Sequence, residues 1–159
     1  MSVTDAKGFV AAGVAAGIKP SGKPDVALVR SVVPAVGAAM WTTNRVEAAP
    51  VTVSRRSMEL AEPQAVVINA GVANAATGAG GIADAEATAV ATGEALGLAP
   101  EQVVVMSTGV IGARLPMDKL RAGISLAAGA LSEDGGEAAS VAIMTTDEFA
   151  KTAAVTRDG

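Results

Sequence analysis

The chain has 159 residues, of which 50% are hydrophobic and only 2% aromatic, and its formal net charge of −4 is spread along the sequence. This length and composition favour one domain with a core of small side chains, and they exclude a basic nucleic-acid surface and a membrane span. Because cysteine and histidine are absent, disulfides, cysteine metal sites and a Ser-His-Asp triad are excluded as well. We expect no metal, no nucleic-acid partner and no membrane partner. We also expect a cytoplasmic location, since residues 1–5 lack the basic start of a signal peptide.

The first third of the chain predicts a short antiparallel meander. Residues 8–19 are small and apolar with three glycines, which cost a helix roughly 1 kcal/mol each and therefore favour an irregular strand. A turn cluster is expected at 20–25, followed by strands at 26–32 and 36–43. Three strands joined by short turns indicate antiparallel pairing.

The middle third predicts two helices and a buried strand. A short helix is expected at 53–60, a strand at 65–69 and a glycine-rich loop at 70–81. Residues 82–96 predict an amphipathic helix that ends at Gly97. Its expected apolar face consists of Ile82, Ala85, Ala89, Val90, Gly93 and Leu96, and its polar face contains Asp84, Glu86, Thr88 and Thr92.

The stretch at 103–112 carries the clearest candidate for chemistry. Residues 103–106 predict a buried strand, and Gly109 and Gly112 predict a turn directly after it. A strand that ends on Ser-Thr-Gly presents a hydroxyl and an unobstructed backbone N–H, which are donors that can hold an oxyanion. By residue type alone, an ordinary strand followed by a tight turn is the simpler interpretation.

The last third predicts two more helices and a final strand. The first helix begins near Pro116, which is tolerated in a first turn, and extends to about residue 131. A second helix is expected at 138–144 and a strand at 151–156. Because Asp158-Gly159 is typical of a hairpin turn, we expect another stretch of polypeptide to pair with this strand.

Three further features have simple structural interpretations. Residues 78–83 loosely match the phosphate-binding pattern G-x-G-x-x-A, but they follow their strand too late and lack the later acidic residue. Residues 145–147, Thr-Thr-Asp, are typical of a helix exit with local hydrogen bonds, and they gain importance if they come near Thr108. Arg114 and Lys119 flank the start of the predicted helix and could meet a carboxylate, but a solvated surface charge is the simpler interpretation of each.

Several of these segments together resemble one known family. The resemblance covers nearly the whole chain and rests on five motifs in the same order: Gly8-Phe-Val-Ala-Ala-Gly-Val-Ala-Ala-Gly-Ile-Lys19; Thr42-Thr-Asn-Arg45 with Ala48-Ala-Pro-Val51; Asn69-Ala-Gly-Val-Ala-Asn-Ala75; Ser107-Thr-Gly-Val-Ile-Gly112 with Leu115-Pro-Met-Asp-Lys119; and Ala142-Ile-Met-Thr-Thr-Asp147. The chain resembles the N-terminal α portion of ornithine acetyltransferase, also called glutamate N-acetyltransferase.

The resemblance implies a self-cleaving enzyme that moves an acetyl group from N-acetylornithine to glutamate. The acetyl group is carried on the N-terminal threonine of a β chain released by autoproteolysis, within an α2β2 heterotetramer, and such a threonine needs neither histidine nor cysteine. Thr108 and Gly109 match the family's oxyanion hole, and Thr145 matches a substrate contact. No cofactor is implied, although acetyl-CoA is a second acetyl donor if the enzyme is bifunctional.

Family α chains continue past the position of Gly159 into Gly-Gly-Met-Ala-Lys-Gly and the scissile bond. We therefore expect residues 1–159 to be a single domain, an α portion shortened before the cleavage junction and inactive by itself. The implied fold is α/β (α+β), with mixed or antiparallel sheets covered by helices and completed by a second chain. Two alternatives remain: an amidase or aminopeptidase on the same self-cleaving scaffold, and a module that binds a phosphate-bearing ligand through residues 71–83.

Overall fold

The structure is a computed structural model, and it describes residues 2–156. Its centre is a four-stranded sheet in the order β1-β2-β3-β4, formed by β1 (Phe9–Val14), β2 (Val26–Ser31), β3 (Ala65–Val72) and β4 (Val103–Val110). The β1–β2 and β2–β3 pairs are antiparallel and β3–β4 is parallel, so the expected mixed sheet is confirmed. The helices are α1 (Ala49–Leu60), α2 (Gly78–Leu96), α3 (Met117–Gly129) and α4 (Gly136–Ala142), with short 3-10 turns at Val3–Asp5 and Pro100–Gln102.

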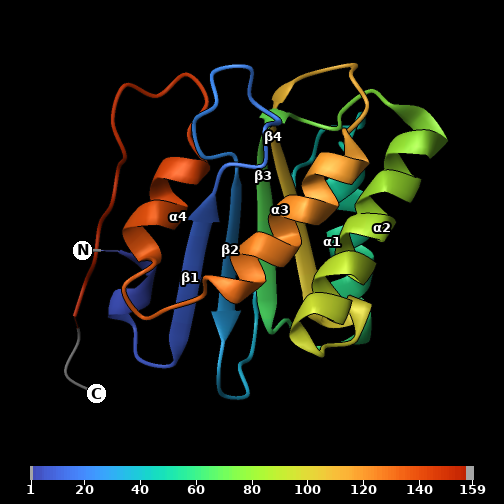
Figure 1. Cartoon of the computed structure of the whole chain (residues 1–159). Helices are drawn as coiled ribbons and strands as arrows, with labels where there is room; N and C mark the ends of the chain where they lie inside the picture. Colours follow the sequence, from blue (N-terminus) through green and yellow to red (C-terminus); the bar gives the residue numbers. More distant parts are fainter. Residues whose placement is uncertain (1, 157–159) are drawn as a thin grey trace.

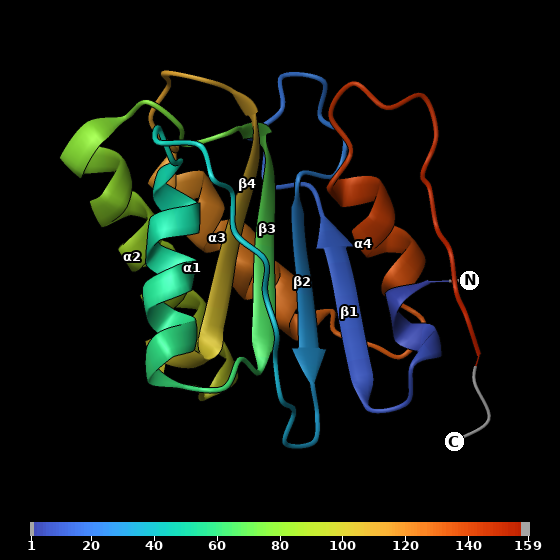
Figure 2. The same cartoon turned by 180° about the vertical axis from the view of Figure 1, so that it is seen from behind.

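The sheet is covered differently on its two faces. Alternate strand residues such as Leu28 and Val67 join the larger core with α1, α2 and α3, where Leu120 and Ile124 are also fully buried. Burying one such side chain contributes about 1.5–3 kcal/mol. The intervening strand residues carry a smaller core with α4: Ala11, Ala27, Val29, Ile68, Ala139 and Ala142. Helix α3 therefore lies against one face, in front of the strands in Figure 1 and behind them in Figure 2, whereas α4 covers the other face over β1 and β2.

Each outer edge of the sheet is hydrogen-bonded at one residue. At the β4 edge, the Ser54 hydroxyl of α1 donates to the Val105 carbonyl (2.8 Å) and accepts the Val105 N–H (2.9 Å). At the β1 edge, Ala11 and Ser132 exchange two backbone hydrogen bonds. Covered edges keep a sheet from pairing with other chains.

The strands predicted at 36–43 and 151–156 are both wrong, since neither segment has regular structure. Segment 36–43 joins no strand of the sheet and instead passes in front of β3 in Figure 2. The Gln64 side chain binds both the N–H and the carbonyl of Ala35, which replaces strand pairing at this point. Residues 151–156 are exposed. The hairpin predicted at Asp158-Gly159 lies outside the described residues.

Several element boundaries also differ from prediction. The first strand ends at Val14, well before residue 19, and helix α1 begins at Ala49 with Pro50 in its first turn. Helix α2 begins at Gly78, inside the predicted loop. Its glycines allow close packing there: a Cβ on Gly80 would lie 2.1 Å from Nη1 of Arg114, and one on Gly81 1.8 Å from Oγ1 of Thr77. The pattern indicated a loop because glycine is unfavourable inside helices, and packing overrode that preference.

The predicted polar face of α2 is largely buried. Asp84, Thr88 and Thr92 all lie inside, while Val90, predicted to face the core, is 42% exposed. The two threonines satisfy their hydroxyls locally, since Thr88 donates to the Asp84 carbonyl (2.7 Å) and Thr92 to the Thr88 carbonyl (2.8 Å). Helix α2 packs against both α1 and α3, so two of its faces are buried, including the one predicted to face solvent. No helix in the described part of the chain is long and apolar enough to cross a bilayer.

Candidate functional site

The candidate site lies at the carboxyl ends of the parallel strands β3 and β4. Thr108 pairs with Ala70 and Gly109 with Gly71, so strand β4 continues through Gly109. The position predicted for the turn was therefore wrong. Thr108 is half-buried and Gly109 is exposed. Ligands in α/β sheets commonly bind beyond the carboxyl ends of the strands. Gly109 therefore stands where a ligand can reach its backbone.

Glycine is required at both members of the Gly71–Gly109 pair. Their φ angles are 120° and 134°, which residues with a side chain rarely adopt. A Cβ on Gly109 would lie 2.3 Å from the carbonyl carbon of Gly71 and 2.6 Å from the N of Val72. The two backbones touch here, and no side chain of residue 109 screens its backbone N–H.

Two neighbouring hydroxyls have different roles. The Ser107 hydroxyl donates to Oδ1 of Asn69 (2.6 Å), and Nδ2 of Asn69 donates to the Val72 carbonyl (2.8 Å). Asn69 is only 2% exposed, so this network stabilises the strand ends from within. Within the described residues the Thr108 hydroxyl makes no hydrogen bond, which leaves it available to a ligand. Sequence reasoning missed Asn69, although a polar residue at the end of an apolar strand was the available signal.

The loop after β3 is tied to the end of β4. The Ala73 N–H donates to the Val110 carbonyl and the Gly112 N–H to the Ala75 carbonyl, both at 2.9 Å. Asn74, fully buried with a φ of 49°, donates through Nδ2 to the Gly81 carbonyl (2.8 Å) and accepts from Thr77. The loop is thus fixed against both β4 and the start of α2.

Arg114 and Asp84 form a two-point ion pair beside this loop. Nε and Nη2 of Arg114 donate to the two carboxylate oxygens of Asp84 at 2.6 and 2.8 Å, and this hydrogen bonding raises the pKa of Arg114. Arg114 is a surface charge as expected, since its side chain is 56% exposed, and Asp84 is the carboxylate partner that the sequence had left open. Lys119 also has a partner, since Nζ donates to the Gly17 carbonyl (2.8 Å). The glycines at 80 and 81 have a packing role, and the nearby guanidinium is already paired.

Thr145 follows α4 on an exposed segment. Nearby, the carboxylate of Asp147 accepts hydrogen bonds from the Lys151 ammonium and from the Thr145 backbone, and these lower the pKa of Asp147. Across residues 2–156, no hydrogen bond joins Thr145 to Thr108 or Gly109. Figure 1 shows that the end of α4 and the ends of β3 and β4 nevertheless lie at the same end of the sheet, with loop 15–25 between them.

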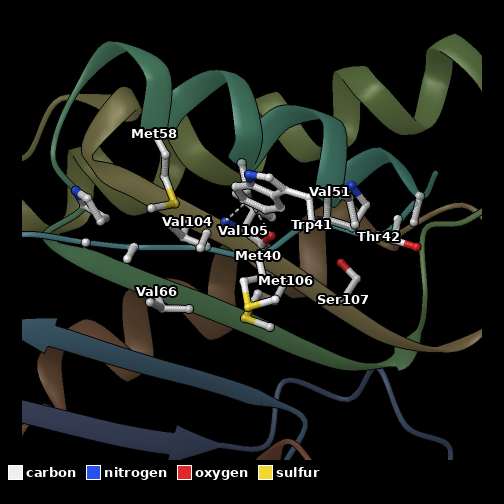
Figure 3. Close-up of a pocket in the computed structure, with 17 residues that line it drawn as sticks. Met40, Trp41, Thr42, Val51, Met58, Val66, Val104, Val105, Met106 and Ser107 are labelled. Atoms are coloured by element: carbon white, nitrogen blue, oxygen red, sulfur yellow. Dashed lines mark hydrogen bonds between the residues drawn. The ribbon is translucent and has the colours of Figure 1, made fainter. Parts of the chain in front are cut away.

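A mainly apolar groove of about 510 Å³ adjoins the site. Helix α1, strand β4 and residues 37–42 form its walls, and Figure 3 shows Ser107 and Thr42 toward one end and Met58 toward the other. Trp41 lies over this groove with its ring 5.7 Å from the Arg55 guanidinium carbon. Sequence reasoning did not find this groove, because it assigned residues 36–43 to a strand.

Within residues 2–156, the end of this parallel strand pair carries a hydroxyl without a hydrogen-bond partner next to a backbone N–H that its own residue does not screen. Such a site is suited to stabilising an oxyanion in acyl transfer. The chain belongs to the ArgJ family, whose sequence model matches residues 10–158. It is 55% identical to the arginine biosynthesis bifunctional protein ArgJ of Streptomyces coelicolor over all of this chain and 42% of that protein. It is also 55% identical to the same-named protein of Symbiobacterium thermophilum over 96% of this chain and 38% of that protein.

Two solved structures have the same fold. The ornithine acetyltransferase of Mycobacterium tuberculosis, solved with ornithine, superposes with a TM-score of 0.90 at 46% identity and covers 93% of this chain and 81% of its own. ArgJ of Bacillus halodurans gives a TM-score of 0.87 at 39% identity, with 94% and 78% covered. The resemblance stated from the five motifs is thereby confirmed. The chain spans about two fifths of the length of the curated relatives it matches.

Proposed function

We propose that this chain is the α portion of a glutamate N-acetyltransferase that moves an acetyl group from N-acetylornithine to glutamate. The observation that carries the proposal is the end of β4, where the Thr108 hydroxyl is unbonded within the described residues and Gly109 has no side chain to screen its N–H. These two donors lie on a chain of the ArgJ family, whose solved member from Mycobacterium tuberculosis is named an ornithine acetyltransferase.

The reaction proceeds in two acyl-transfer steps. The hydroxyl oxygen of the β chain's N-terminal threonine attacks the acetyl carbonyl, and its proton passes to the threonine's own amine. The resulting oxyanion accepts hydrogen bonds from Thr108 and Gly109 before the C–N bond breaks and the leaving amine of ornithine takes the proton. Glutamate then attacks the acetyl-threonine through its amine, which reverses the sequence and frees the threonine. Each oxyanion donor contributes on the order of 10²–10³ in rate.

The β chain is part of the same proposal. This chain matches about two fifths of the length of the curated relatives but about four fifths of the length of the solved chains. The solved chains are therefore roughly half as long as the curated relatives. Cleavage of a full-length protein into two chains would produce that difference. We further propose an α2β2 assembly, a substrate contact at Thr145, acetyl-CoA as a second donor in keeping with the relatives' name "bifunctional", and no activity for the 159-residue chain by itself. The expected cytoplasmic location stays a prediction.

The test uses the protein expressed from its full gene. Intact and native mass spectra are expected to show this chain together with a second chain that begins with threonine. The protein is then incubated with acetyl-labelled N-acetylornithine and glutamate. We expect label in N-acetylglutamate, and label found only in free acetate would replace the proposal with the amidase alternative.

The variant Thr108→Val tests the oxyanion donor directly, because valine keeps the shape and removes the hydroxyl. Turnover per β chain is expected to fall on the order of 10²–10³, with Thr108→Ser as the matched control that keeps a hydroxyl. Equal turnover of the valine variant and the parent protein would remove Thr108 from the mechanism.

A further inference from the structure

We propose that Asp25 and Lys19 are positioning residues, which hold loop 15–24 as a rigid spacer between the oxyanion donors and the segment that carries Thr145. The assignment rests on the proposed function, and it adds two residues that touch neither the reacting atoms nor the substrate. Loop 15–24 joins β1 to β2 and lies at the same end of the sheet as the ends of β3 and β4 and the end of α4, between them in both Figure 1 and Figure 2.

The carboxylate of Asp25 organises the loop. Asp25 is fully buried, and its two oxygens accept three backbone N–H groups, those of Ala16 (2.7 Å), Ile18 (2.6 Å) and Lys19 (2.8 Å). Hydrogen bonds to a charged acceptor are about twice as strong as neutral ones, and three of them compensate the cost of burying this charge. The three hydrogen bonds therefore restrain the backbone of residues 16–19 around one buried carboxylate.

The organised loop contacts the oxyanion strand pair at two points. The backbone carbonyl of Asp25 accepts the N–H of Ala70 (2.8 Å), and Ala70 is the register partner of Thr108. In addition, Gly71 lies directly under the loop: a Cβ there would be 3.1 Å from Cγ2 of Ile18 and 3.4 Å from Cγ of Lys19. Since Gly71 is in backbone contact with Gly109, the loop, Gly71 and Gly109 form one continuous packed layer.

The ammonium of Lys19 extends this layer to α4. Nζ donates to the Pro24 carbonyl within the loop (2.6 Å) and to the Ala142 carbonyl (3.1 Å). Ala142 is the last residue of α4, three positions before Thr145, and a cation there satisfies a carbonyl left free at the helix end. Lys19 is half-buried; this burial lowers the pKa of its ammonium, and the charge of Asp25 opposes that shift.

The two residues predict different kinetic signatures. Asp25 reaches the oxyanion donors through Ala70 and Gly71, so loss of its charge is expected to lower kcat. Lys19 reaches Thr145 through Ala142, so its loss is expected to raise KM for N-acetylornithine. A residue with only a structural role would instead lower the amount of folded, processed enzyme and leave both constants of the remaining enzyme unchanged.

The experiment measures kcat and KM for the full-length, processed protein, with rates expressed per β chain. For Lys19→Met we expect at least a fivefold rise in KM with kcat within twofold, and for Asp25→Asn at least a tenfold fall in kcat. The matched control is Lys23→Met in the same loop, because Lys23 is exposed and is expected to leave both constants unchanged. If Asp25→Asn does not fold, Lys19→Met and the double variant below test the spacer by themselves.

A double variant separates this inference from the proposed function. If Lys19 acts through Thr145, Lys19→Met adds no further rise in KM to a protein that already carries Thr145→Val. Independent, multiplying effects on KM would overturn the spacer while leaving Thr145 as a substrate contact. An unchanged KM in Thr145→Val alone would instead remove the proposed substrate contact.

Discussion

The two halves of the candidate site are held in very different ways. The strand ends that carry Thr108 and Gly109 are fixed by backbone contact at Gly71 and by the partly buried Asn69–Ser107 hydrogen bond. The segment that carries Thr145 is exposed and has no regular structure after α4. Packing within this chain therefore fixes Thr108 and Gly109, the proposed oxyanion donors. The position of Thr145, the proposed substrate contact, depends instead on its short connection to α4 and on any further contacts of this exposed segment.

Among variants at the strand ends that carry Thr108 and Gly109, Gly109→Ala is expected to lower stability most. Its Cβ would overlap the backbone of Gly71, and alanine is strained at a φ of 134°, so we expect a loss of about 2–5 kcal/mol in the free energy of unfolding. Chemical denaturation measures this loss. The control is Gly112→Ala, where φ is also positive (83°) but nothing lies within 4 Å of the added Cβ, so it should cost only about 1 kcal/mol. Equal costs at the two positions would show that the close contact between the strands is unimportant.

A smaller effect is expected for Ser107→Ala. Removing the hydroxyl leaves the buried Oδ1 of Asn69 without its donor, which should cost about 1–3 kcal/mol of unfolding free energy. Denaturation curves of the variant and the parent protein give the difference directly. No measurable change would mean that the Asn69 side chain finds another partner and that this network does not stiffen the strand ends.

Thr108→Val should change the free energy of unfolding far less than Ser107→Ala does, although Thr108→Val is expected to change turnover far more. Thr108 is half-buried and its hydroxyl has no partner within residues 2–156, so we expect a change within about 0.5 kcal/mol. The same denaturation measurement checks this value. A loss as large as that of Ser107→Ala would indicate a structural role for the Thr108 hydroxyl and would weaken its assignment as an oxyanion donor.

The smallest effect on stability is expected at Asp147, in the exposed segment that also carries Thr145. The Lys151 ammonium lowers the pKa of the Asp147 carboxyl in the folded chain, so this pair contributes stability above the ordinary aspartate pKa of ~4, and the contribution is lost as pH falls through the lowered pKa. Both side chains are exposed and screened by solvent. We therefore expect the melting temperature of Asp147→Asn to equal that of the parent protein at neutral pH and at pH 3. A clear difference at neutral pH would show that this segment is more firmly held than its exposure indicates.

The sequence predicted best where local pattern and tertiary packing agree. The valine-rich strands at 65–69 and 103–106 and the helices near 82–96 and 116–131 are all confirmed, because their hydrophobic periodicity matches what the core requires. Prediction failed where partners distant in sequence decide the outcome. Residues 36–43 look like a strand but pair with no strand of the sheet, and Asp84 looks like a surface residue until Arg114 pairs with it.

The sequence by itself determined the ArgJ family, the class of fold and the chemistry that remains possible without cysteine or histidine, because motifs and composition are local properties of the chain. It also named Thr108, Gly109 and Thr145 as candidate residues. Only the tertiary structure decided that the backbones of Gly71 and Gly109 touch. It also decided that the Ser107 hydroxyl is hydrogen-bonded to Asn69, whereas the Thr108 hydroxyl has no partner within the described residues. Finally, it showed that Asp25 and Lys19 link the strand ends to α4. Each of these facts is a contact between segments far apart in the chain, and no local pattern encodes which segments meet.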